Sequence, residues 1–189
     1  MDEHPYDYRS CSSLFGYAAQ VHARSGGICE LCGWGSGREP KFDVWRQLTV
    51  ERLVRESQGG YLANIRLAVA ERFPELGPDR REDLSLRIDA VNTISACSFC
   101  NWVTRRDLSQ RDMVDLITGS GLGPEETYRA IAAFALSILE RRRRDVEWKL
   151  ASIGEAYEQL IVPDLVKARD ERSGEGSPRR AAGSKGGTS

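Results

Sequence analysis

The stretch Cys97–Asn101, which reads CSFCN, repeats the Cys-x-x-Cys spacing of the CELC stretch at residues 29–32. A two-residue spacer lets both thiolates of a pair face one metal ion at about 2.3 Å. Two such pairs in a chain without a secretory leader pattern predict tetrahedral zinc rather than disulfides. The alternative is one redox-active Cys-x-x-Cys pair, with the other two cysteines incidental. The fifth cysteine, Cys11, is expected to be a small buried side chain or a surface thiol. The expected structural zinc ligands are Cys29, Cys32, Cys97 and Cys100.

Composition sets limits on the class of protein. The 189 residues include 27 Lys and Arg against 28 Asp and Glu, so the formal net charge of −1 excludes a globally basic nucleic-acid binder. Hydrophobic residues make up 40% and charged residues 29%, which suits a folded domain with a polar surface. No run approaches the roughly 18 apolar residues of a membrane span. We therefore expect a cytoplasmic protein with no membrane partner.

The segment between the cysteine pairs is too long for a simple zinc ribbon, so it must hold structure of its own. Partial alternation of apolar residues at 42–54 predicts a β-hairpin or two short strands. Helical periodicity at 61–91 predicts two helices, and residues 101–118 follow as another.

The C-terminal part predicts a long helix over about 125–170. Leu139, Val146, Ile153 and Leu160 recur every seven residues, which fits a homodimeric coiled-coil seam or a helix packed on its own domain. Residues 171–189 have almost nothing to bury and predict a disordered tail. The expected organisation is an N-terminal segment at 1–20, a zinc domain at 21–118 with a helical insertion at 61–91, a helical extension at 124–170 and the tail.

The sequence TVERLVRESQGG at residues 49–60 adds a second set of spaced residues. Asn92 precedes Cys97 by five positions, and Asn101 directly follows Cys100. Together with the cysteine pairs, this pattern resembles the HNH endonuclease family over about residues 22–106. Two positions depart from the family pattern: Arg52 stands at the histidine position and Arg55 at the proline position. The positions in register are Cys29, Cys32, Glu51, Leu53, Val54, Ser57, Gly59, Gly60, Asn92, Cys97, Cys100 and Asn101.

The resemblance implies an α+β, mostly helical fold with a zinc-bound ββα-metal, treble-clef-like core and long C-terminal helices. It implies that Glu51 and Asn101 bind a catalytic Mg²⁺ or Mn²⁺ that holds the scissile phosphate of DNA. It further implies that Asn92 clamps a loop through side-chain hydrogen bonds and that the zinc is structural. In the family, a histidine beside the acid takes the proton of the attacking water.

Arg52 cannot take over that proton transfer, because a guanidinium stays protonated at any working pH. Its fork geometry suits a phosphate instead. Of the two histidines, His4 lies in a polar terminus, and His22 fits a packing role better than that of a base. Two hypotheses follow: a weakened HNH endonuclease, or an inactive scaffold that binds nucleic acid or a protein partner. An oligomerising structural protein is a third.

Local basic residues are the candidates for contact with nucleic acid. Arg52, Arg105 and Arg106 are the expected phosphate contacts. The consecutive run Arg141–Arg144 circles a helix, and we interpret it mainly as a solvated turn paired with neighbouring acids. The three tryptophans Trp34, Trp45 and Trp102 flank the cysteine pairs and the predicted strands, and they favour a small core over base stacking.

Overall fold

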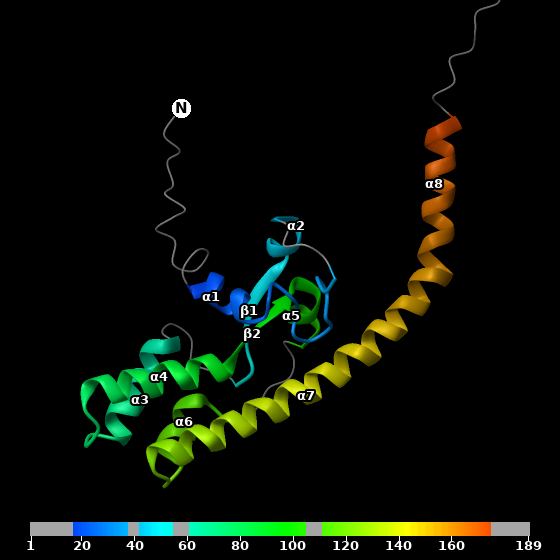
Figure 1. Ribbon diagram of the computed structural model, residues 1–189. Coiled ribbons are helices and arrows are strands. Elements are labelled where there is room, and N and C mark those ends of the chain that lie inside the picture. The colour runs from blue at the N-terminus through cyan, green and yellow to red at the C-terminus, as the bar shows by residue number, and fades with distance from the viewer. Residues whose placement is uncertain (1–16, 38–41, 55–60, 105–110, 175–189) are drawn as a thin grey trace, which may run out of the picture. The chain divides into compact units, whose positions relative to one another are not determined.

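The computed structural model describes residues 17–37, 42–54, 61–104 and 111–174. These residues are mostly helical and include one small sheet, which confirms the α+β class (Figure 1). The chain divides into two compact units, of which the first ends at Glu147 and the second begins at Trp148. The predictions made for most of the N-terminal segment, for Arg105 and Arg106, and for most of the C-terminal tail fall outside the described residues.

The sheet of the first unit joins two strands that are far apart in the sequence. Strand β1 (Leu48–Arg52) pairs antiparallel with β2 (Thr93–Cys97), with Leu48 opposite Cys97 and Arg52 opposite Thr93. The prediction of a hairpin or two strands within 42–54 is therefore wrong. A short helix, α2 (Phe42–Trp45), precedes β1, and the strand that pairs with β1 comes after the helical insertion. Residues 93–97 are all buried, so they lack the alternation that marks a strand exposed on one face.

Two helices fill the chain between the strands. Helix α3 (Tyr61–Arg72) buries Ile65 and Val69, and it ends just before Pro74. Helix α4 begins with a proline in its first turn, runs over Pro78–Asn92, and buries Leu84 and Ile88 on one side. The chain passes from α4 into β2 without a connecting loop, so the insertion directly sets where the second strand begins.

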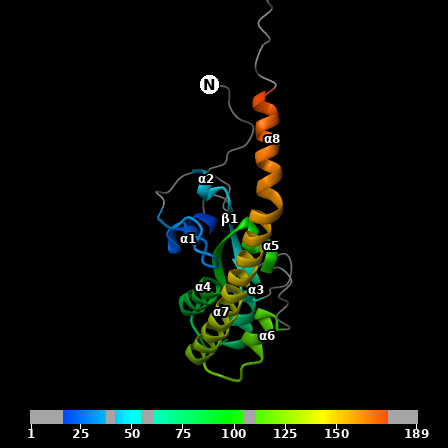
Figure 2. The same ribbon diagram turned by 90° about the vertical axis from the view of Figure 1, so that its right-hand side faces the viewer.

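Helices flank the sheet on both sides. Helix α1 (Tyr17–Arg24) and helix α5 (Ser98–Thr104) lie on opposite sides of the two strands (Figure 1). Helix α5 starts directly after β2, so the second cysteine pair spans the strand-to-helix junction. The single helix expected at 101–118 is instead α5 and a separate α6 (Met113–Thr118), which packs against α3 with Ile117 buried (Figure 2).

Helix α7 (Pro124–Ala156) begins in the first unit and continues into the second. Its buried residues recur at helical spacing and end at Val146: Thr127, Ile131, Ala135, Ile138, Leu139, Arg142 and Val146. The heptad row predicted from Leu139 to Leu160 is therefore split, since its first two members are buried in the first unit. A π-helical turn, η3 (Tyr157–Ile161), and helix α8 (Val162–Gly174) follow, so helix continues past the predicted boundary at 170.

None of the helices that the structure describes combines the length and apolar composition that crossing a membrane requires.

Candidate metal centre

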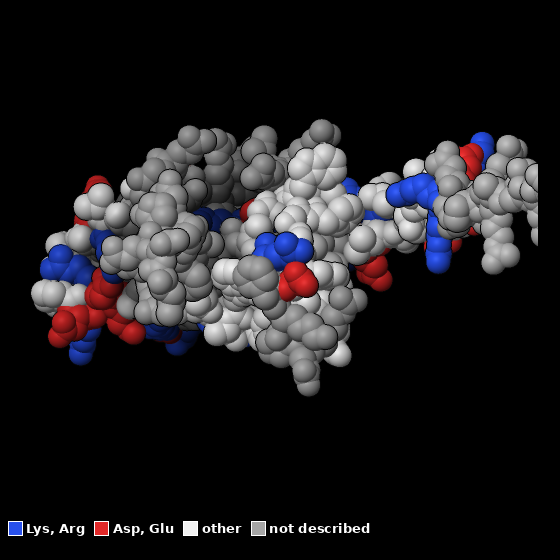
Figure 3. Space-filling model, turned by 90° about the horizontal axis from the view of Figure 1, so that it is seen from above, with Lys and Arg blue, Asp and Glu red and all other residues white. Residues whose placement is uncertain are grey.

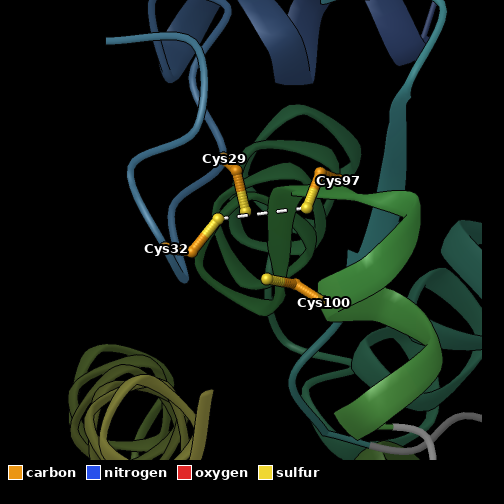
Figure 4. Close-up of side chains that lie close together, drawn as sticks. All are labelled: Cys29, Cys32, Cys97 and Cys100. Atoms are coloured by element: carbon orange, nitrogen blue, oxygen red, sulfur yellow. Dashed lines mark hydrogen bonds between the residues drawn. The ribbon is translucent and has the colours of Figure 1, made fainter. Parts of the chain in front are cut away.

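Four cysteines from two distant segments converge in the first unit (Figure 4). Their sulfur atoms all lie within 4.8 Å of one another, and the sulfurs of Cys32 and Cys97 are 3.9 Å apart. Four sulfurs placed about 2.3 Å from a central ion at tetrahedral angles are roughly 3.8 Å apart from one another. The four cysteines are therefore positioned to bind one metal ion, and four thiolates in this geometry are the donor set that Zn²⁺ favours.

The first cysteine pair lies in a tight turn shaped by glycine. Gly33 donates its N–H to the carbonyl of Cys29 at 2.8 Å, and it has φ +72°, a conformation that is costly for other residues. The N–H of Cys29 donates to the carbonyl of Trp34 at 3.0 Å. These bonds close the turn around the two sulfurs. The turn thus presents Cys29 and Cys32 to one point in space although neither cysteine belongs to a helix or strand.

Proximity also changes the acidity of the thiols. Hydrogen bonds from Cys100 and Cys97 hold the pKa of Cys29 far below its ordinary value. Burial raises the pKa of Cys32 to about 11, and the hydrogen bond with Cys29 raises the pKa of Cys100. A first thiolate on Cys29 disfavours a second one nearby, because like charges at this distance repel each other. A divalent cation removes that repulsion and allows all four to ionise.

The cysteine turn is fastened to strand β2 through Glu30. Its backbone N–H donates to the carbonyl of Ser95 at 2.8 Å, and its carboxylate accepts the N–H of Ser95 at 2.8 Å. Arg143 of α7 donates to the Glu30 carbonyl, also at 2.8 Å. The metal site is thus tied to the sheet and to α7 by hydrogen bonds, and these fix its orientation relative to Glu51.

Helix α1 is held against the same strand by two basic side chains. His22 is buried, and its Nδ1 lies 2.7 Å from the hydroxyl of Ser95, while Arg24 donates to the hydroxyl of Thr93 at 2.7 Å. Burial lowers the pKa of His22, so its neutral form is favoured in the folded chain. Both contacts belong to packing, in line with the packing role expected for His22.

Glu51 and Arg52 do not share a site, because neighbouring residues on a strand point to opposite faces of the sheet. Arg52 pairs with Thr93, and Glu51 pairs with Ile94. Glu51 therefore shares a face with Thr49, toward α5 and α7, and Arg52 lies on the face that carries α1. The acid and the residue at the histidine position are separated by the sheet itself.

Arg142 of α7 occupies the space in front of Glu51. Its Nη1 donates to the Glu51 carboxylate at 3.1 Å and to the carbonyl of Arg52 at 3.1 Å, and its Nη2 donates to the carbonyl of Leu53 at 3.4 Å. Arg142 is only 4% exposed. A buried guanidinium paired in this way is costly to remove, because an unpaired carboxylate would be left behind.

Sequence reasoning missed Arg142 by treating Arg141–Arg144 as one solvated turn. Arg142 falls on the same helical stripe as Ile138 and Val146, four residues from each, and that spacing is the signal that could have found it. Its neighbours Arg141, Arg143 and Arg144 are exposed, as expected.

Asn101 lies in α5 on the same face of the sheet as Glu51. Its Nδ2 donates to the hydroxyl of Thr49 at 2.9 Å, and that hydroxyl in turn donates to the carbonyl of Ala96 at 3.0 Å. Since the single hydroxyl proton goes to Ala96, the amide nitrogen of Asn101 must face Thr49. The amide oxygen is buried and accepts no hydrogen bond from the part of the chain that the structure describes, which leaves it available to a cation.

Asn92 is the last residue of α4, where it is fully buried, and its side chain reaches the backbone just after β1. Its Oδ1 accepts the N–H of Val54 at 2.6 Å, and its Nδ2 donates to the Val54 carbonyl at 3.2 Å. The backbone adds a bond from the N–H of Leu53 to the Asn92 carbonyl at 2.9 Å. Asn92 therefore fixes the two residues that follow Glu51 and Arg52, and one of these is a carbonyl partner of Arg142.

Comparison of the chain with family models, with curated proteins and with solved structures finds no match.

Proposed function

We propose that this chain is an HNH-type ββα scaffold, held together by structural zinc, that binds nucleic acid without cutting it. The cysteine cluster supports the zinc assignment through its four convergent sulfurs. The order of β1, β2 and α5 supports the scaffold assignment, since the cysteine pair at the junction of β2 and α5 lies where the resemblance requires it. The hydrogen bonds of Asn92 to Val54 are those that a clamping residue would make.

The main support for a protein that does not hydrolyse DNA is one ion pair: Arg142 is paired with Glu51 at 3.1 Å in a buried position. In an active site of this type, the carboxylate would hold a divalent cation that stabilises charge on the phosphate. Here the carboxylate is already neutralised by a side chain that cannot lose its proton. A cation would have to displace that guanidinium and its bonds to two carbonyls, which makes the site a poor competitor for Mg²⁺.

Proton transfer is the second missing function. Arg52 cannot act as a base, and His22 is a packing residue on the far side of the sheet from Glu51. Removal of a general base typically reduces a rate about 10²–10⁴-fold. The base activates the attacking water and the cation stabilises charge on the phosphate, so lack of both opposes phosphodiester cleavage more than lack of either alone.

Binding of nucleic acid rests on local charge and is expected to be weak. On the face shown in Figure 3, basic and acidic side chains lie beside one another instead of forming a field of one sign. Residues 21–60 and 92–111 together carry a net charge of +3, and their basic residues include Arg52, Arg105 and Arg106. Few phosphate contacts predict low affinity with a shallow dependence on salt.

A metal-dependent nuclease is the second candidate, and it is favoured by the amide oxygen of Asn101, which is buried without a hydrogen-bond partner among the described residues. A buried acceptor without a partner costs free energy unless a ligand or ion uses it. If Arg142 moves away when substrate binds, Glu51 and Asn101 could share a cation. This candidate predicts that the wild-type chain cuts DNA.

Incubation of supercoiled plasmid with the zinc-loaded protein in Mg²⁺ or Mn²⁺ separates the two candidates. We expect no cutting by the wild type, and slow, metal-dependent cutting by Arg142→Gln, which frees Glu51 for a cation. Arg144→Gln in place of Arg142→Gln is the matched control, because Arg144 is exposed on the same helix. Cutting by the wild type that stops with Glu51→Gln would establish the nuclease instead.

Two further results complete this test. Addition of Asn101→Ala should abolish cutting by Arg142→Gln, and failure of Arg142→Gln to cut removes Glu51 and Asn101 as cation ligands. Fluorescence anisotropy of a labelled duplex then tests binding, which we expect to weaken with salt. A chain that shows no binding at low salt is not a nucleic-acid scaffold.

A further inference from the structure

The helix that runs from α7 through η3 into α8 changes character at the boundary between the two units. Up to Val146, α7 buries a regular row of side chains. From Glu147 to Arg172 no residue is buried, although this segment contains many large apolar side chains. A helix in water is marginally stable without tertiary packing, and its apolar side chains gain from being covered.

Six apolar side chains form a stripe along one side of the second unit, while the exposed Trp148, Leu160 and Val166 lie off it. Five of its members are between 40% and 51% exposed, and the last, Ala168, is half-buried. Successive members are three or four residues apart, which is the spacing of a seam between paired helices. The apolar stripe consists of Leu150, Ile153, Tyr157, Ile161, Leu165 and Ala168.

The π-helical turn keeps this stripe continuous. In η3, the N–H of Val162 bonds to the carbonyl of Tyr157, five residues back, so the turn takes in one extra residue. The stripe consequently resumes at Ile161, and Leu160 is displaced to its side. Pro163 follows directly and has no N–H to continue the regular ladder, which explains why the irregular turn occurs here.

We propose that the apolar stripe pairs with the same stripe of a second copy of the chain, forming a two-stranded helical dimer. Both helices then present identical seams of large and small residues, which interdigitate when aligned. The flanking charges match, since Asp164 and Arg169 lie five residues apart beside the stripe and face each other's counterparts in a parallel pair. The seam is about 27 Å long at a rise of roughly 1.5 Å per residue, so the dimer is of moderate affinity.

This pairing is independent of the zinc site and of the proposed nucleic-acid scaffold. The stripe is a shorter and different seam from the heptad row predicted from the sequence, because Leu139 and Val146 are buried in the first unit and cannot contact a second copy. Any function that needs two scaffolds, such as holding two phosphate segments, would gain from it through effective concentration.

Sedimentation of the full zinc-loaded chain over concentrations from about 1 to 200 µM tests the proposal. We expect the mass to rise from 21.1 kDa toward twice that value. Leu165→Glu should keep the chain monomeric throughout, because it places a charge in the seam. Val166→Glu is the matched control: Val166 is the next residue, 53% exposed against 51% for Leu165, and it points away from the stripe.

The results that overturn the proposal are equally distinct. A mass of one chain at every concentration excludes the pair. If Leu165→Glu and Val166→Glu lower the dimer fraction equally, the stripe is not the seam. Zinc content and helical circular dichroism of each variant exclude unfolding as the cause. If vesicles recruit the wild type while it stays monomeric in solution, the stripe covers a lipid surface instead, which also overturns the pairing.

Discussion

The cysteine cluster and the edge of the sheet at Glu51 are two places in the described part of the first unit that carry donors for a cation, and they differ in what faces those donors. At the cluster, four sulfurs within 4.8 Å face one another. At the sheet edge, one carboxylate faces the guanidinium of Arg142 at 3.1 Å. Residue types that match a family's metal site therefore do not by themselves determine a cation site. A guanidinium from a distant helix can pair with the carboxylate that would bind the cation.

Loss of one sulfur should produce the largest effect. Cys100→Ser leaves three thiolates, and we expect zinc to fall from one per chain to near zero, with unfolding of the sheet and its helices. Structural zinc contributes an apparent 10–16 kcal/mol or so in small domains, which exceeds the usual stability of about 5–15 kcal/mol. Atomic absorption and circular dichroism measure both quantities. Cys11→Ser is the control and should retain zinc; equal loss in both variants would contradict the assignment.

Removal of the guanidinium comes next in size. Arg142→Gln strands Glu51 in a half-buried position and weakens the hold on two carbonyls, so we expect the free energy of unfolding to fall by about 3–5 kcal/mol. Urea denaturation measures the change, and Arg144→Gln should have almost no effect. A double variant with Glu51→Gln should recover part of the loss. A value for Arg142→Gln no larger than that of the control would show that the pair does not stabilise the fold.

A smaller loss is expected from Asn92→Ala, which touches neither donor set. It leaves the N–H and carbonyl of Val54 without their side-chain partners, at a cost of about 2 kcal/mol. The zinc content should stay at one per chain, since the cysteines are unaffected. Asn101→Ala removes one part-buried hydrogen bond and should cost less than 1 kcal/mol or so. A larger loss of unfolding free energy for Asn101→Ala than for Asn92→Ala would contradict the assignment of Asn92 as the clamping residue and Asn101 as a candidate cation ligand.

Much of this arrangement could be predicted from short-range patterns. The cysteine spacing pointed to a metal cluster, and apolar periodicity pointed to the helices at 61–91 and 125–170, because these signals depend on residues a few positions apart. Strand β2 could not be predicted in this way. It is buried on both faces and pairs with a strand on the far side of two helices, so neither alternation nor a turn marks it.

The contact of Arg142 with Glu51 was beyond the same reasoning, since the two residues are 91 positions apart. The apolar periodicity of α7 marks Arg142 as the inward-pointing arginine, since Ile138 and Val146 lie four residues on either side, but no sequence pattern marks Glu51 as its partner. The C-terminal helix shows the same limit: a single heptad row in the sequence is divided in the structure into a buried part and an exposed part.

Binding of Mn²⁺ to the zinc-loaded protein, followed by electron paramagnetic resonance, shows whether Arg142 occupies the place of a cation beside Glu51. We predict no Mn²⁺ site on the wild type, one site on Arg142→Gln, and loss of that site when Glu51→Gln or Asn101→Ala is added. Each protein is measured below its thermal transition, with zinc content confirming the fold. A wild-type chain that binds one Mn²⁺ through Glu51, or an Arg142→Gln variant that binds none, would contradict the claim that Arg142 stands in for the cation.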